Sequence, residues 1–136
     1  MSKNLILHST IKGEGAPLLI LHGYFGMSDN WKSLGNQFSK KYQVHLIDQR
    51  NHGRSFHADA FNYEVLVDDL YQYIQHHQLA GIYLIGHSMG GLIALDVSLK
   101  LDCKLSILMN TSYPLMVGEI LLQHAKGNLD QANEFM

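Results

Sequence analysis

A serine flanked by glycines is the residue of this sequence best suited to chemistry. Residues 86–91 read Gly-His-Ser-Met-Gly-Gly, with an apolar run before them and a run of helical period after them. Between a strand and a helix, G-x-S-x-G forces the serine into a strained turn that exposes its hydroxyl above the sheet edge. Glycine two residues to either side removes side chains that would collide. The pattern predicts Ser88 as a nucleophile, and the alternative is a glycine-rich structural turn.

A nucleophilic serine also needs hydrogen-bond donors for the negative oxygen that forms during attack. The N–H of Met89 is one candidate, because the start of a helix favours negative charge. The loop His-Gly-Tyr-Phe-Gly at 22–26 can supply the second donor. We expect this donor to be the N–H of Tyr24, with that of Phe25 as second choice, and we expect both side chains to contact substrate. His22 is interpreted as a structural residue that orients this loop, in preference to a catalytic base.

The most polar stretch, residues 47–55, directly follows the third predicted strand. Its charged and titratable side chains could form a charge relay or a phosphate site. A structural loop, held by hydrogen bonds of its carboxylate and guanidinium groups, is the favoured interpretation. The side chains in question are Asp48, Arg50, His52 and Arg54.

The order of apolar runs predicts the α/β class. Apolar runs of strand length recur along the chain, and from the second run onward they alternate with segments of helical period. This order is expected for a doubly wound, mostly parallel sheet in a three-layer α/β/α arrangement. The first run is expected to make a hairpin-like turn into the second. The predicted strands are 5–11, 17–22, 42–48, 81–86 and 104–110, and the predicted helices follow Ser28, span Tyr63 to Ile74 and contain Leu92, Leu95 and Leu99.

Composition limits the classes of function. The chain has 136 residues, a net charge of -2 and 16% charged residues, so nothing favours a nucleic-acid partner. No window approaches the roughly 18 apolar residues of a membrane span, and no signal peptide is evident. A single cysteine, Cys103, fits a reducing compartment. These features predict a cytoplasmic protein without membrane insertion.

Three segments together, 22–31, 48–55 and 86–91, give the chain a resemblance to the α/β-hydrolase fold superfamily. It looks most like the small cytosolic serine esterases of that superfamily. The resemblance implies an acyl-enzyme at Ser88 on carboxylic ester or thioester substrates, with Tyr24 and Met89 as oxyanion donors and with no metal or cofactor. It also implies that residues 1–112 form the N-terminal half of the core and that 113–136 begin a cap.

The same resemblance calls for an acid and a histidine after later strands, in that order. The only histidine after Ser88 is His124, which Glu119 or Asp130 could orient. That histidine falls in the presumed cap and is a poor candidate for the base. His87 should point away from the nucleophile on a turn of this shape. We therefore expect a core truncated after about five or six strands and an incomplete catalytic site.

Two other functions remain open from the sequence. The chain could be a catalytically inactive truncated or split fragment that acts through association, as a homo-oligomer or with a complementing fragment, at an exposed sheet edge. It could also be a carbon-carbon hydrolase or lyase on the same fold. A serine nucleophile argues against the dehalogenase and epoxide-hydrolase branches, which need a carboxylate.

Overall fold

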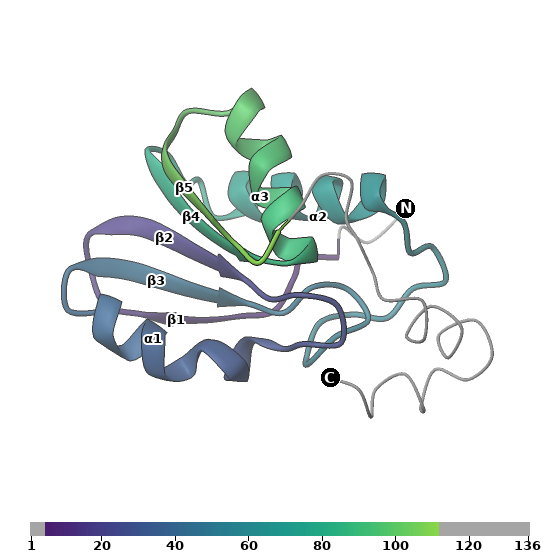
Figure 1. The fold of residues 1–136 in the computed structure, drawn as a ribbon, viewed down its shortest axis with the longest axis horizontal. Helices are drawn as coiled ribbons and strands as arrows, with labels where there is room; N and C mark the ends of the chain where they lie inside the picture. The colour runs from purple at the N-terminus through teal and green to yellow at the C-terminus, as the bar shows by residue number, and fades with distance from the viewer. Residues whose placement is uncertain (1–4, 112–136) are drawn as a thin grey trace.

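The computed structural model describes residues 5–111 and places them in one mixed sheet with helices on both faces (Figure 1). The strands are β1 (Ser9–Lys12), β2 (Ala16–Leu21), β3 (Tyr42–Ile47), β4 (Ile82–His87) and β5 (Cys103–Met109). The helices are the 3₁₀ turn η1 (Ser28–Trp31), α1 (Lys32–Phe38), α2 (Tyr63–His76) and α3 (Met89–Lys100). The predicted α/β class and its order of strands and helices are confirmed.

The strand order is β1-β3-β2-β4-β5, and only β1 runs antiparallel to its neighbour. The predicted hairpin-like pairing of the first strand with the second is wrong. Both edges of β2 are occupied by the parallel strands β3 and β4, so β1 pairs with the far side of β3. The first strand is also shorter than predicted, because the N–H and C=O of His8 bond to Ser55 and Asp48.

The pleat of β2 explains why its apolar run is continuous. Leu19 and Leu21 point into a core cluster with the residues of α2 and α3, whereas Leu18 and Ile20 point into a second cluster that includes side chains of α1. Figure 1 shows the corresponding layers, with α1 on one face of the sheet and α2 and α3 on the other. A strand buried on both faces needs apolar residues at every position.

An ion pair joins α2 to the loop that follows β3. The Arg50 guanidinium donates to both carboxylate oxygens of Asp69, with Nε to Oδ2 at 2.6 Å and Nη2 to Oδ1 at 2.8 Å. Its Nη1 donates to the carbonyl of Ala60. The side chains of Arg50 and Asp69 are only 12% and 7% exposed. Bidentate pairing of this kind fixes geometry as well as charge, so the loop is held in one position relative to α2.

Replacing Asp69 by Asn should destabilise the fold, because it leaves the Arg50 charge poorly paired in a site with little access to water. We expect a loss of about 3 kcal/mol in the free energy of unfolding, measured by urea denaturation. Asp68 is the neighbouring, exposed carboxylate and provides the matched control. Asp68→Asn should change the free energy by less than about 0.5 kcal/mol. Equal effects of the two substitutions would contradict a structural role for the ion pair.

Candidate active site

Ser88 occupies a strained turn between β4 and α3. Its backbone has φ 54° and ψ -116°, in the region that residues with a Cβ rarely adopt. The surroundings hold this conformation from both sides: the Ser88 N–H donates to the carbonyl of Met109, and the Ser88 carbonyl accepts from the N–H of Gly91 and the hydroxyl of Thr111. The residue is half-buried. A strained, partly exposed serine at this position is the geometry that the sequence pattern predicts.

The two glycines of the pattern allow α3 to begin close to the sheet. A Cβ on Gly90 would lie 2.6 Å from the carbonyl oxygen of Leu21 and 2.7 Å from that of His22. A Cβ on Gly86 would overlap the carbonyl of Gly90. The first turn of α3 can therefore approach the end of β2 only when these positions lack side chains.

The loop 22–26 packs directly against Ser88. A Cβ on Gly23 would lie 3.1 Å from the Cβ of Ser88, which shows how closely the two segments approach. The carbonyl of Gly23 accepts from the Gly26 N–H at 3.0 Å and contacts the ring Nδ1 of His22 at 2.7 Å. These bonds close a tight turn beside Ser88.

The backbone donors of this loop differ in what they bind. The N–H of Phe25 donates to Nε2 of His52 at 3.1 Å. Among the hydrogen bonds between residues 5–111, none uses the N–H of Tyr24 or that of Met89. The geometry therefore favours Tyr24 over Phe25 as the donor from this loop, and assignment of Tyr24 and Met89 to an oxyanion remains a prediction.

His22 is held as a neutral, buried imidazole. Its Nδ1 donates to the Gly23 carbonyl, and its Nε2 accepts from the N–H of Gln49 at 3.0 Å. The Gln49 side chain in turn donates to the His22 carbonyl at 2.6 Å. Burial lowers the pKa of His22 to about 4. Because both ring nitrogens are occupied, the residue orients the loop, as the sequence predicts.

The polar loop 47–55 is organised around the buried carboxylate of Asp48. This group accepts from the N–H of Ser28 at 2.7 Å and from the N–H of Arg54, and it contacts Nδ1 of His8 at 3.2 Å. Burial alone would raise the pKa of Asp48, but the bonds from Ser28, Arg54 and His8 outweigh it and hold that pKa below its usual value. These contacts support the structural-loop interpretation over a phosphate site.

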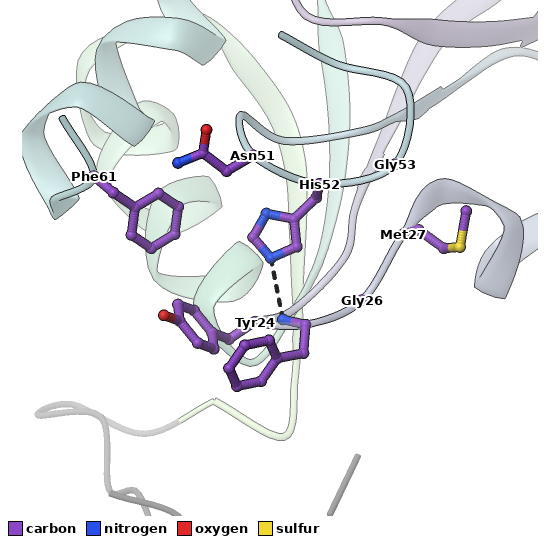
Figure 2. Close-up of a pocket in the computed structure, with 8 residues that line it drawn as sticks. Tyr24, Gly26, Met27, Asn51, His52, Gly53 and Phe61 are labelled. Carbon is purple, nitrogen blue, oxygen red and sulfur yellow. Dashed lines mark hydrogen bonds between the residues drawn. The ribbon is translucent and has the colours of Figure 1, made fainter. Parts of the chain in front are cut away.

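Two cavities share the residues Tyr24, Phe25 and Gly26 in their walls. The first has a volume of about 520 Å³ and is also lined by Met27, Asn51, His52 and Phe61, most of whose side chains are visible in Figure 2. The second, also of about 520 Å³, is bounded by residues next to Ser88, namely Gly23 and His87, together with Trp31. The aromatic loop therefore lines space suited to an apolar substrate.

Of the remaining candidate residues, the described part of the chain includes only His87. The ring of His87 packs 5.5 Å from that of Trp31, centroid to centroid. His124, Glu119 and Asp130 lie outside the described residues, as does the expected cap at 113–136. Within residues 5–111, no group of three or more His, Cys, Asp or Glu side chains is placed to hold a metal ion. No helix of that same part is long and apolar enough to cross a membrane.

Comparison with known proteins decides the family. A family model described as the alpha/beta hydrolase fold matches residues 16–136. The chain belongs to this family. The α/β-hydrolase resemblance and the fold class predicted from the sequence are therefore confirmed.

Relatives within the alpha/beta hydrolase family include enzymes of ester chemistry. The chain is 37% identical over 91 residues to the sn-1-specific diacylglycerol lipase ABHD11 of Danio rerio, covering 65% of this chain and 29% of that protein. It is 37% identical to ethanol acetyltransferase 1 of Kluyveromyces lactis, covering 62% of this chain and 23% of that protein. A solved marine microorganism esterase shares 45% identity at a TM-score of 0.73, with 77% of this chain and 41% of that chain covered.

These relatives are longer than the present chain. It spans about a third of the length of the curated relatives that it matches. The match covers the segments that carry Ser88 and the loop 22–26, both of which lie within residues 16–136. The family match therefore includes the described site, but it covers only part of the length over which the relatives carry their activities.

The neutral state of His22 predicts a loss of stability in acid. Its pKa is about 4 in the folded protein against an ordinary value of 6.5, so the unfolded state binds more protons between these pH values. The free energy of unfolding should therefore fall as pH decreases from about 6.5 through 4, by up to about 3 kcal/mol from this residue. Urea denaturation at a series of pH values measures the change.

His22→Gln keeps a donor and an acceptor but removes the titration, so its stability should depend less on pH. Some dependence will remain, because burial also lowers the pKa of His45 to about 4. A pH dependence identical in the variant and the parent would contradict the assignment to His22.

Proposed function

We propose that this chain carries the nucleophile and oxyanion loop of a serine hydrolase that acts on carboxylic ester or thioester bonds. The proposal rests on the strained, half-buried Ser88 and on the loop 22–26 that packs against it. Family membership and the names of the relatives support ester chemistry. No metal or cofactor is required for acyl transfer at such a site.

In the proposed reaction the Ser88 hydroxyl oxygen attacks the ester carbonyl and its proton passes to a general base. The carbonyl oxygen becomes an oxyanion that accepts hydrogen bonds from the N–H groups of Tyr24 and Met89. Collapse of this intermediate breaks the bond to the leaving oxygen, which takes the proton from the base. The alcohol leaves and an acyl-enzyme remains. Water then attacks the acyl carbon, which frees the acid and returns the proton to Ser88.

The base that receives the proton is not found within residues 5–111, where no histidine is hydrogen-bonded to the Ser88 hydroxyl. His22 is excluded because both of its ring nitrogens are occupied. The proposal therefore takes the base from outside the described residues, for example His124 or a histidine of a further segment or chain. Either group has to come within hydrogen-bond reach of Ser88.

The substrate class proposed is a small ester or thioester with an apolar acyl group. Tyr24, Phe25 and Phe61 supply aromatic walls to the first of the two cavities next to the loop. The relatives named as acetyltransferases suggest a variant of the same chemistry, in which an alcohol takes the place of water in the second step. Profiling of products in the presence of ethanol separates hydrolysis from transfer, and ketone substrates test a carbon-carbon hydrolase.

Labelling of Ser88 by a fluorophosphonate tests the proposal. The reagent should modify the parent chain, and p-nitrophenyl acetate should be hydrolysed, whereas Ser88→Ala should lose the label and at least about 10³-fold of any such activity. Ser98→Ala is a matched control, because Ser98 lies on α3 and bonds only within its own helix. Absence of labelling in the parent, or equal labelling of Ser88→Ala, would overturn the proposed function.

A second candidate function, association through β5, rests on exposed apolar side chains. Leu105 and Ile107 are 52% and 44% exposed, and Leu108 and Met109 are 39% and 36% exposed. Within the described residues β5 pairs with β4 alone, so its other edge offers free backbone groups. Apolar sheet edges favour pairing with another strand. We propose that this edge binds a strand of a second copy or of a complementing segment.

Cys103 supports a reducing compartment, and we propose a cytoplasmic location.

A charge on β5 should weaken this association. Ile107→Lys places an ammonium group on the edge strand and should lower the apparent mass measured by sedimentation velocity. Leu99→Lys is the control, because Leu99 is 78% exposed and belongs to α3, not to the edge strand. A parent chain that sediments as a monomer at all concentrations, or equal effects of the two variants, would rule out self-association through β5.

A further inference from the structure

We propose that His52 is a positioning residue for the oxyanion loop: by accepting the Phe25 N–H, it holds loop 22–26 so that the neighbouring Tyr24 N–H remains available at Ser88. This inference rests on the proposed function. The sequence interpretation placed His52 in a structural loop and gave it no part in the site.

The hydrogen bonds of His52 define its tautomer. Its Nε2 lies 3.1 Å from the N–H of Phe25, the bond drawn as a dashed line in Figure 2. Since a backbone N–H only donates, Nε2 is the acceptor. Nδ1 lies 2.8 Å from the carbonyl oxygen of Arg50, which only accepts, so Nδ1 carries the proton. The imidazole therefore joins loop 47–55 to loop 22–26 as a neutral ring.

Phe25 adopts a conformation that needs such support. Its φ is 61°, in the left-handed region, which costs a residue with a Cβ about 1 kcal/mol or more. The bond to His52 fixes the peptide that joins Tyr24 to Phe25. The centroid of the Phe25 ring lies 4.2 Å from that of the Tyr24 ring, and this packing restrains both side chains of the turn.

The position of His52 is itself secured from two directions. Arg50, whose carbonyl accepts from Nδ1 of His52, is tied to α2 through the bidentate pair with Asp69. The His52 ring also packs near two other rings, with its centroid 4.9 Å from that of His22 and 6.0 Å from that of Phe61. A continuous set of contacts thus leads from α2 through Arg50 and His52 to Phe25.

Loss of the acceptor should release this turn. Without a partner for its N–H, Phe25 can return to a right-handed φ, and the rotation displaces the adjoining Tyr24 peptide from Ser88. The effect belongs to the reaction step and not to initial binding, because an oxyanion donor acts on charge that develops during attack. Substrate or reagent affinity should therefore change little.

The test compares His52→Phe, which keeps a ring and removes the acceptor, with His52→Gln, whose amide oxygen can accept. For fluorophosphonate labelling of Ser88 in the full chain, we expect His52→Phe to lower the maximal rate by about 10²-fold. The half-saturating reagent concentration should stay within about twofold. His52→Gln should recover most of the rate, and His57→Phe, which alters an exposed histidine of the same region, should match the parent.

A measurement on the unsubstituted chain tests the hydrogen bond directly and does not depend on whether a variant folds. In the unsubstituted, ¹⁵N-labelled chain, a scalar coupling across the hydrogen bond should join the Phe25 amide nitrogen to Nε2 of His52. Absence of this coupling, or equal labelling rates for His52→Phe and the parent, would overturn the role of His52 while leaving Ser88 as the nucleophile. Failure of the parent to show labelling that depends on Ser88 would overturn the proposed function and the role of His52 with it.

Discussion

The described site depends on one steric constraint, the close approach of the start of α3 to the end of β2. Gly90 faces the carbonyls of Leu21 and His22 at a separation that leaves no space for a side chain. This contact sets where α3 begins, and the chain can leave β4 and enter α3 only through a sharp turn. Ser88 occupies that turn and takes the left-handed conformation that it requires. The exposure of the hydroxyl thus follows from the packing of a helix against a neighbouring strand.

The loops at this edge of the sheet are held by polar groups that have little access to water. The Asp48 carboxylate accepts hydrogen bonds from backbone N–H groups of two segments. Arg50 binds Asp69 and so holds its own loop against α2. His22 joins the end of β2 to Gln49. Since each of these groups is paired, the loop beside Ser88 is already ordered without a ligand. A site arranged in advance stabilises developing charge without reorganising during the reaction.

Local patterns were sufficient to predict the strained turn at Ser88 and the parallel core, because both follow from residues adjacent in sequence. Ser88 and its two glycines lie within five residues, and the run of β2 is apolar on both faces. The pairing of β1 with β3 could not be predicted in this way, because it depends on competition among strands for the edges of β2. The role inferred for His52 depends on a contact with Phe25, 27 residues away, which no local pattern indicates.

The left-handed conformation of Ser88 also has a thermodynamic consequence for this fold. Strain at one such residue costs about 1–3 kcal/mol, a substantial fraction of the roughly 5–15 kcal/mol by which a domain is stable. Glycine would adopt the same backbone without that cost, so replacing Ser88 by glycine should stabilise the fold. Under the proposed function, the serine at position 88 therefore lowers the stability of the fold while it supplies the reactive hydroxyl.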